Sequence, residues 1–158
     1  MIRRIELAEI DKCLLVIQES FATVAKEFGI TKLNCPNHTS FMKAEKLQKQ
    51  FSEGCHMFAY IDNQKIVGYF SLTPDGNSRY ELNNLAVLPE YRHKGYGKEM
   101  ITFAIDEVQK LGCNIITIGI IEENTRLKNW YKDLGFKHTG TKKFEHLPFT
   151  VGFMEISL

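Results

Sequence analysis

The sequence predicts a mixed α/β protein in which strands and helices alternate along one domain. Two observations support this prediction: short runs rich in β-branched residues, and longer stretches in which apolar residues recur every three or four positions. The length of 158 residues suits a single domain, and no repeat, linker or low-complexity segment divides the chain. We therefore expect residues 1–158 to form one domain.

Six elements are predicted in the first part of the chain. They are, in order, a strand at 3–7, a helix at 10–28, a helix at 41–53, and strands at 55–61, 65–72 and 79–88. Both helices have apolar residues at helical spacing, with Gly29 placed to end the first and Ser40 to cap the second. The turn at 62–64 makes a hairpin of the strands beside it.

Five elements are predicted in the rest of the chain. They are a helix at 95–110, a strand at 114–121, a helix at 125–134, a strand beginning at 136 and a strand at 149–156. The run at 114–121 is continuous and β-branched, which predicts a strand buried on both faces. Glu122 and Glu123 favour the start of the following helix, and Gly135 ends it. The predicted order is β-α-α-β-β-β-α-β-α-β-β.

The composition excludes several classes of protein. Hydrophobic residues make up 44% of the chain and charged residues 25%, which is typical of a globular protein. The net charge of +1 indicates neither a nucleic-acid partner nor an acidic membrane surface. Residues 1–12 lack the apolar core of a signal peptide, and no apolar run approaches the roughly 18 residues of a membrane span. We expect a cytoplasmic protein with no membrane or nucleic-acid partner.

The cysteines do not predict a metal site. The chain has four of them: Cys13, Cys35, Cys55 and Cys113. Without an export signal they are expected to be reduced. Their spacing relative to His38 and His56 matches no standard zinc finger. We expect small buried or loop residues and no metal.

The stretch from Glu81 to Met100 joins an apolar strand to a helix through a loop with two glycines. The first turn of a helix has free N–H groups and a positive dipole end, and Gly95 and Gly97 let the backbone approach a ligand closely. Such a loop fits a phosphate or pyrophosphate, although a plain strand-to-helix turn is the alternative. A Walker A loop is excluded because glutamate follows Gly97-Lys98. A dinucleotide fingerprint is excluded because Met100 occupies the place of its third small residue.

The remaining pattern is R-x-x-G-x-G from Arg92 to Gly97, and it resembles the pyrophosphate loop of the GNAT family of N-acetyltransferases. A second segment, from Asn124 to Phe136, reads N-x-x-x-x-x-W-Y-x-x-x-G-F and resembles the later motif of that family. The element order is similar as well, so the resemblance covers nearly the whole chain. It implies a mixed, mostly antiparallel sheet of six to seven strands, flanked by helices, with splayed central strands.

The resemblance also implies acetyl-CoA as co-substrate. Backbone amides of the loop would bind its pyrophosphate, the backbone of the preceding strand would pair with the pantetheine arm, and Asn124 would contact the arm or the diphosphate. The implied cofactor-binding residues are Leu85, Ala86, Val87, Arg92, His93, Lys94, Gly95, Tyr96, Gly97, Lys98 and Asn124. Without the resemblance, the strand side chains predict only a core, and Asn124 predicts a helix cap.

Glu81 and Tyr131 are the candidate catalytic residues. A lysine-like amine has a pKa of about 10.4, so forming its free base at pH 7 costs roughly 4.6 kcal/mol, and an enzyme must remove this proton. Glu81 lies four residues before Leu85, where histone-acetylating members of the family carry a glutamate. The resemblance places the Tyr131 hydroxyl near the coenzyme sulfur. For Glu81 the alternatives are an exposed carboxylate at the end of a strand and a side chain turned away by a strand bulge. For Tyr131 the alternative is a core aromatic residue, like its neighbour Trp130.

The expected activity is direct transfer of acetyl to a primary amine of a small molecule or a peptide. Gly119 stands where ribosomal-protein N-terminal acetyltransferases of the family carry a glutamate, which disfavours an N-terminal alanine as acceptor. By resemblance the acceptor enters between residues 28–41 and 142–149, where His38 is more typical of a surface residue. A non-catalytic acyl-CoA-binding or regulatory module is the alternative function, and an exposed last strand allows a homodimer.

Overall fold

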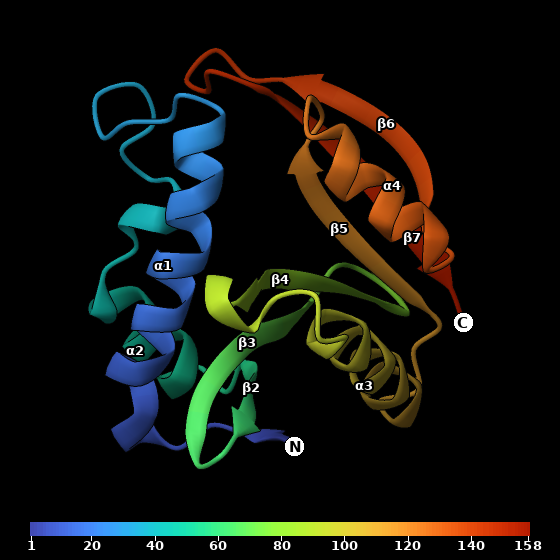
Figure 1. The fold of residues 1–158 in the computed structure, drawn as a ribbon. Helices are drawn as coiled ribbons and strands as arrows, with labels where there is room; N and C mark the ends of the chain where they lie inside the picture. The colour runs from blue at the N-terminus through green and yellow to red at the C-terminus, as the bar shows by residue number, and fades with distance from the viewer.

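The computed structural model describes residues 1–158 and contains seven strands and four α-helices in the predicted order (Figure 1). The strands are β1 (Ile2–Arg4), β2 (His56–Asp62), β3 (Lys65–Pro74), β4 (Arg79–Val87), β5 (Ile115–Ile121), β6 (Lys137–Lys143) and β7 (Thr150–Ser157). The helices are α1 (Ile10–Glu27), α2 (Ala44–Ser52), α3 (Tyr96–Lys110) and α4 (Thr125–Asp133). Three short 3-10 turns are η1 (Leu7–Glu9), η2 (Thr39–Phe41) and η3 (Pro89–Tyr91). No helix is both long enough and apolar enough to cross a bilayer.

All seven strands form one sheet in the order β1-β2-β3-β4-β5-β7-β6. Every neighbouring pair is antiparallel except β4 and β5, which are parallel. These two central strands pair only where residues 79–81 meet residues 115–117, and they then diverge (Figure 1). The mixed, mostly antiparallel sheet with splayed central strands confirms the predicted fold class.

A β-bulge in β4 accompanies this divergence. Ala86 is opposite Tyr69 on β3, and Asn83 is opposite Ser71. Asn84 and Leu85 of β4 therefore both face Phe70 of β3. Asn84, in the bulge, has a φ of 54°. A bulge bends its strand and increases its twist, which turns the end of β4 away from β5. The bulge lies beyond Glu81, so it does not reverse the direction of that side chain.

The β2–β4 part of the sheet is covered on both faces. Phe70 of β3 packs against Phe103 of α3, with ring centroids 6.3 Å apart, while its neighbour Tyr69 points to the opposite face, toward α1. Both β3 side chains are fully buried. Because successive strand residues alternate between faces, α1 and α3 enclose this half of the sheet from two sides. The largest core cluster, of 29 buried residues, is centred here.

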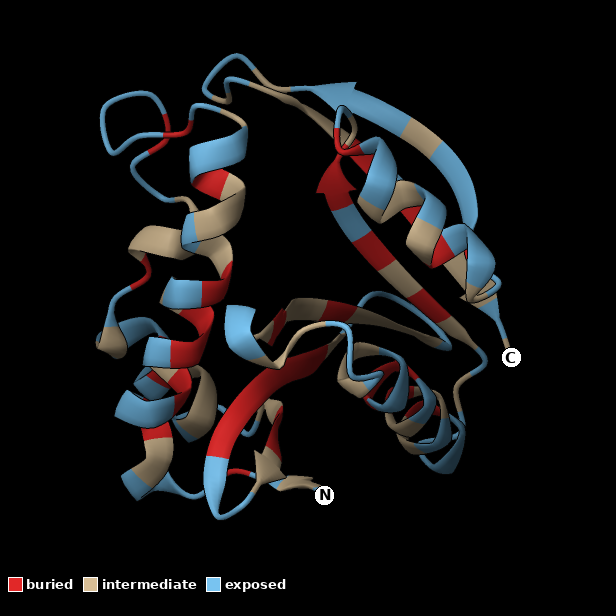
Figure 2. Cartoon of the chain, viewed as in Figure 1, coloured by how far each residue is buried: buried red, intermediate tan, exposed pale blue.

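The β5–β7 part is covered on one face, and the prediction that residues 114–121 are buried on both faces is wrong. Along β5 the buried residues are Ile116, Ile118, Ile120 and Ile121, whereas Gly119 is exposed and Thr117 is half-buried (Figure 2). Packing by α3 and α4 covers one face, but α1 lies over β3 and β4 and leaves the other face of β5 open. The continuous apolar run therefore did not distinguish a strand covered on one face from one covered on two.

Two further sequence predictions are corrected by the structure. Ser40 does not cap α2, because it lies in η2, where its N–H donates to the Nδ1 atom of His38 at 3.3 Å. Helix α2 begins only at Ala44 and has no side-chain cap. The last strand is not an exposed edge, because β7 pairs with β5 on one side and with β6 on the other. The edge strands are β1 and β6, and the exposed lysines of β6 are a common protection of edge strands against pairing.

We predict that Gly68→Ala on β3 destabilises the fold by about 1–3 kcal/mol through overpacking. A Cβ atom there would lie 3.0 Å from the Cβ of Tyr60, 3.1 Å from the Cε of Met100 and 3.2 Å from the carbonyl oxygen of Ala86. The Ala86 carbonyl belongs to β4 and cannot move without shifting that strand. Urea unfolding measures the loss, and Gly140→Ala, where a Cβ would have no neighbour within 4 Å, is the control. Equal stability of the two variants would contradict the prediction.

Candidate active site

The loop between β4 and α3 presents a run of free backbone N–H groups. None of the six amides from His93 to Lys98 donates a hydrogen bond within the protein, whereas the next amide, that of Glu99, donates to the Gly95 carbonyl at 3.0 Å. His93 and Gly95 have φ values of 62° and 87°, which turn successive amides to one side. Nothing lies within 4 Å of the position that a Gly95 Cβ would occupy. A concave set of free amides at a helix start is an anion-binding geometry.

Gly97 has a different role from Gly95 because it is a close-packing residue. A Cβ on Gly97 would lie 3.1 Å and 3.3 Å from two carbons of the Trp130 ring. The indole of α4 therefore packs directly on the first turn of α3. This contact confirms that Trp130 is a packing residue. It joins α3, which follows β4, to α4, which follows β5.

Tyr96 fixes the loop to β2. Its ring stacks on Tyr60 at a centroid distance of 4.2 Å, and its hydroxyl donates to Asp62 at 2.8 Å. The Tyr60 hydroxyl donates in turn to Glu99 in the first turn of α3 at 2.7 Å. These contacts leave only the backbone amide of Tyr96 available to a ligand in the loop.

The basic side chains of the loop divide into one that is bound and three that are exposed. The guanidinium of Arg92 turns back to α1, where it donates to the Thr23 hydroxyl at 3.1 Å and the Ser20 carbonyl at 2.9 Å. It also donates to the carbonyl of Val87 at 3.4 Å. His93, Lys94 and Lys98 are exposed, and Lys94 lies over the Tyr91 ring. Arg92 therefore anchors the loop, while Lys94 and Lys98 surround it with positive potential.

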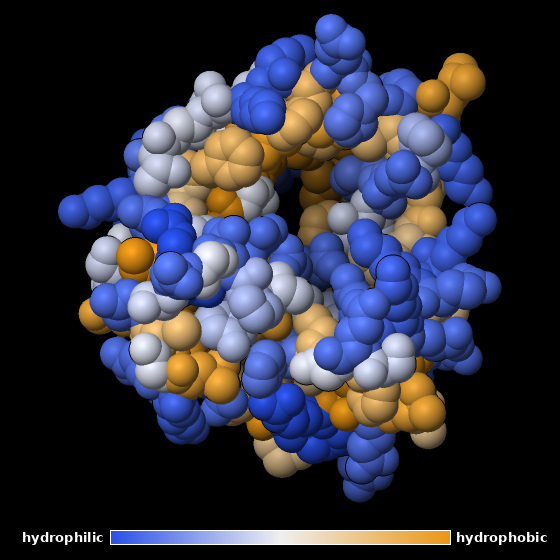
Figure 3. Space-filling model, turned by 180° about the vertical axis from the view of Figure 1, so that it is seen from behind, coloured by the Kyte–Doolittle hydropathy of each residue, from blue (hydrophilic) through white to orange (hydrophobic).

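The predicted strand residues lie along the gap between β4 and β5. Ala86 and Val87 pair with β3 on one side of β4, whereas β5 offers no partner to any residue beyond Glu81. The Ala86 side chain is buried and those of Leu85 and Val87 are half-buried, and no strand pairs with the backbone of this stretch on the side of the gap. Seen from behind, the molecule is hollowed near its centre (Figure 3).

Asn124 and Tyr131 lie on α4, beyond the end of β5. Asn124 is 7% exposed, and its side-chain oxygen accepts a hydrogen bond from the Leu127 N–H at 3.1 Å, so it is a helix cap in this structure. Tyr131 is 5% exposed and packs edge-on against Trp130 and Phe136. Burial raises the pKa of Tyr131, so the phenol stays protonated. Its hydroxyl makes no hydrogen bond within the protein, and the hydroxyl oxygen is not completely buried.

Glu81 lines a groove of about 350 Å³ on the uncovered face of the sheet. It lies in the last row where β4 still pairs with both neighbours, opposite Thr73 and Thr117. Its carboxylate has no ion-pair or hydrogen-bond partner and is half-buried, so the interpretation as an exposed strand-end carboxylate is wrong. Burial raises the pKa of Glu81, and the charge of Asp75 raises it further. Asp75 itself accepts a hydrogen bond from the Thr117 hydroxyl at 2.7 Å.

The two segments predicted to admit the acceptor meet in a small apolar cluster. Phe28 and Phe41 from the first segment and Leu147 and Phe149 from the second pack around four buried residues. Those four are Ala25, Ile30, Cys35 and Ile121. The cluster joins the end of α1 to the β6–β7 turn and so bridges the two halves of the sheet (Figure 1).

His38 is part of the same wall. Its ring lies edge-on to Phe21 and to Phe41, each with a centroid distance of 6.2 Å. Burial lowers the pKa of His38, which favours the neutral imidazole. His38 is half-buried, so the expectation of a simple surface histidine is wrong.

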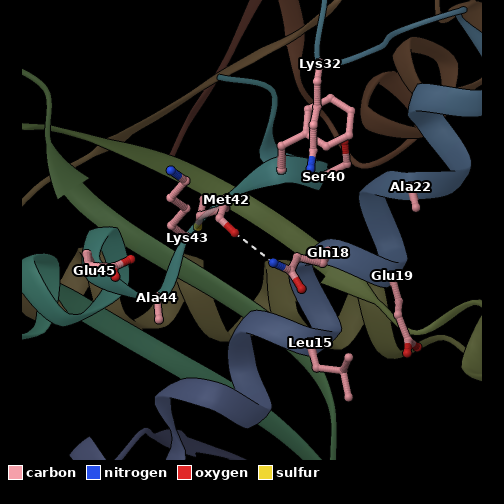
Figure 4. Close-up of a pocket in the computed structure, with 11 residues that line it drawn as sticks. Leu15, Gln18, Glu19, Ala22, Lys32, Ser40, Met42, Lys43, Ala44 and Glu45 are labelled. Carbon is pink, nitrogen blue, oxygen red and sulfur yellow. Dashed lines mark hydrogen bonds between the residues drawn. The ribbon is translucent and has the colours of Figure 1, made fainter. Parts of the chain in front are cut away.

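A larger hollow of about 660 Å³ lies between α1, η2 and α2, and Phe41 lines both this hollow and the apolar cluster (Figure 4). Gln18 crosses it to donate to the Met42 carbonyl at 2.8 Å. It contains none of the predicted catalytic or cofactor-binding residues, although Lys32, Ser40 and Phe41 of the predicted acceptor segment line it, and its walls are mixed in polarity. We assign it no part in the candidate site.

Several residues of the site had no signal in the sequence. Ser20 and Thr23, which hold Arg92, read as ordinary positions on a helix. Asp75 reads as a turn residue, although it influences Glu81. Each becomes part of the site only through contacts between segments distant in sequence.

Comparisons with known proteins agree with this geometry. A sequence profile of the Acetyltransferase (GNAT) family matches residues 23–136. An amino-acid acetyltransferase of Pseudomonas putida is 26% identical over 136 residues, which cover 82% of this chain and 31% of that protein. The chain thus spans about a third of the length of the curated relatives it matches first. Because the profile match covers well over half of the chain, the chain belongs to the GNAT acetyltransferase family.

Solved structures show the same fold. The ribosomal-protein-S18-alanine N-acetyltransferase from Escherichia coli superposes with a TM-score of 0.78 and 17% identity, covering 99% of this chain and 92% of that one. PaiA N-acetyltransferase from Thermoplasma acidophilum, in complex with coenzyme A, gives 0.77 and 20%, covering 100% and 98%. At these identities the likeness concerns the fold alone.

We predict that Gly95→Ala weakens coenzyme A binding by about tenfold, because a side chain at positive φ costs about 1–2 kcal/mol and the loop relaxes out of its shape. Gly112→Ala is the matched control: Gly112 has a φ of 77°, nothing lies within 4 Å of its Cβ position, and it follows the far end of α3. Calorimetric titration measures affinity, and thermal unfolding measures the shared strain. Equal affinity losses in both variants would contradict a specific role of the loop.

Proposed function

We propose that this chain is an acetyl-CoA-dependent N-acetyltransferase that moves the acetyl group directly to a primary amine of a small molecule or a peptide. The observation that carries the proposal is the run of six free amides from His93 to Lys98, at the end of a strand that has lost its partner. Family membership, the name of the Pseudomonas putida relative and the coenzyme A complex of PaiA support it. Residues 1–158 serve as one N-acetyltransferase domain.

The residues present fit the co-substrate. The free amides suit the diphosphate, and the exposed Lys94 and Lys98 suit its charge. The unpaired edge of β4 from Leu85 to Val87 suits the amide groups of the pantetheine arm, which would pair as an added strand does. Asn124, which follows β5 and caps α4, would contact the arm or the diphosphate. The thioester supplies an activated acetyl group, so no covalent attachment to the protein is needed.

Glu81 acts as the base that removes a proton from the acceptor amine, directly or through a water. Its raised pKa makes it a stronger base than an ordinary carboxylate, and its lack of a partner leaves it free to accept a proton. Holding the amine against the acetyl carbon in the groove contributes to the rate as well, because alignment replaces a bimolecular encounter.

Tyr131 acts on the leaving sulfur. Because burial keeps the phenol protonated, its unpartnered hydroxyl can donate a hydrogen bond or a proton to the thiolate as the bond to carbon breaks. Its ring is fixed by Trp130 and Phe136, so the direction of the hydroxyl is set by packing.

The acceptor is expected among amines, in keeping with the names of the relatives, which refer to amino acids and to the alanine of a ribosomal protein. Gly119 lines the groove, so at this position the groove lacks the glutamate that ribosomal-protein N-terminal acetyltransferases of the family carry. The cytoplasmic location, the absence of a metal and of nucleic-acid and membrane partners, and the state of oligomerisation stay predictions.

A non-catalytic acyl-CoA-binding or regulatory module is the second candidate. The same loop would serve it, but it would need neither a free carboxylate at Glu81 nor a free hydroxyl at Tyr131. A thiol-release assay with acetyl-CoA and a panel of amines tests the two proposals. Release that depends on the amine supports the enzyme, and tight coenzyme binding without release supports the module.

We predict that Tyr131→Phe lowers kcat by about 10²-fold while changing acetyl-CoA affinity by less than about twofold, since the hydroxyl acts on the leaving group. Tyr69→Phe is the matched control, because Tyr69 is also a buried tyrosine with an unpartnered hydroxyl but lies toward α1. Steady-state kinetics and coenzyme titration measure the two effects. An unchanged kcat in Tyr131→Phe would remove the acid role.

We predict that Glu81→Gln loses activity near neutral pH and regains it at high pH, where the amine deprotonates without help. In the wild-type enzyme the rate should fall as the pH drops through the raised pKa of Glu81. Asp75→Asn removes a negative charge that raises this pKa, so its acid limb should move to lower pH. The pH profile of kcat/KM measures both, and a Glu81→Gln profile parallel to wild type would contradict the base assignment.

A further inference from the structure

Two guanidinium groups meet on one face of α1, and the proposed function assigns a role to only one of them. Arg92 reaches α1 from the loop and contacts Ser20 and Thr23. Arg126 reaches it from the first turn of α4 and donates to Glu27 at 3.1 Å. The three α1 residues are spaced i, i+3 and i+7, so they form one stripe of the helix.

The two arginines are close enough to influence each other. Burial lowers the pKa of Arg92, and the positive charge of Arg126 lowers it further. Arg92 has no carboxylate partner, and Arg126 pairs with one carboxylate, that of Glu27. Positive charge at this point therefore exceeds negative charge, which favours a bound anion.

Arg126 lies at the same end of the gap as the loop from Arg92 to Gly97. Strands β4 and β5 are parallel, so their carboxyl ends lie at the same end of the gap. The free amides follow the carboxyl end of β4, and Arg126 follows the carboxyl end of β5. Ligands of α/β proteins bind outside the carboxyl ends of parallel strands, where the chain connections diverge. The first turn of α4, which carries Arg126, thus lies at the same end of the gap as the loop.

The resting contact of Arg126 is weak enough to be exchanged. Its side chain is 81% exposed and that of Glu27 is 47% exposed, and ion pairs this exposed contribute little to stability. Phosphate oxygens, like carboxylate oxygens, can accept two parallel hydrogen bonds from the planar guanidinium, so a phosphate can replace Glu27 as its partner.

We propose that Arg126 is a phosphate-binding residue for the coenzyme diphosphate, closing on it from α4 while the loop amides hold it from α3. Glu27 positions the guanidinium in the absence of ligand. This inference rests on the proposed function, because it assumes that a coenzyme occupies the gap. Two phosphate groups of coenzyme A share this chemistry, and the experiment separates them.

The test is calorimetric titration of the full chain with coenzyme A, with dephospho-coenzyme A, which lacks the 3′-phosphate, and with pantetheine, which lacks the diphosphate. We expect Arg126→Ala to raise the Kd of both coenzymes about tenfold, as loss of a charge-assisted hydrogen bond does, and to leave pantetheine binding unchanged. The dependence of the coenzyme Kd on salt should become shallower. Arg126→Lys should recover part of the loss, and Glu27→Gln should bind at least as tightly as wild type.

Lys132→Ala, which removes another exposed cation of α4, should change nothing. Equal losses for pantetheine and the coenzymes, or no loss in Arg126→Ala, would overturn the inference while leaving the proposed function intact. A loss confined to coenzyme A would overturn the diphosphate assignment in favour of the 3′-phosphate. A wild-type chain that binds none of these ligands would overturn the proposed function itself, and the inference with it.

Discussion

The site depends on the loss of pairing between β4 and β5 after Glu81. A central strand edge presents N–H and C=O groups that must find partners, and proteins seldom leave such groups unsatisfied in their interior. Here the bulge at Asn84 bends β4 away, so neither strand can satisfy the other. A ligand rich in amide groups that enters as an extra strand resolves this, which is why the gap is better explained as a binding site than as a packing defect.

The two halves of the sheet have different tasks because they are covered differently. Helices enclose β2 to β4 from both sides, and this packed core supports the loop from Arg92 to Gly97. The β5–β7 half is covered on one face only and offers its other face as a groove. The halves are held together at the open end by the packing contacts of the cluster around Ile121. These contacts set the width of the gap without closing it.

The sequence predicted the elements, their order and the loop well, because those depend on local signals. Gly95 and Gly97 could be read as a loop with unusual backbone, and each is needed, although for different reasons: one for its positive φ and the other for contact with Trp130. The covering of β5 could not be read, since burial on one face or two depends on where α1 packs. The cap of α2 was misplaced because His38 and Ser40 bond each other locally instead.

The candidate site separates into two parts that differ in how far a sequence reveals them. The proposed binding of the coenzyme relies on the backbone, so its signal is glycine spacing and strand position, which can be read from the linear sequence. Proton transfer relies on side chains whose properties come from neighbours distant in sequence. Glu81 is proposed as the base because the fold half-buries it and brings Asp75 beside it, and Tyr131 is proposed as the donor because packing fixes its ring while its hydroxyl has no protein partner. The acceptor, which must contact this second part, is consequently the feature that a sequence describes least.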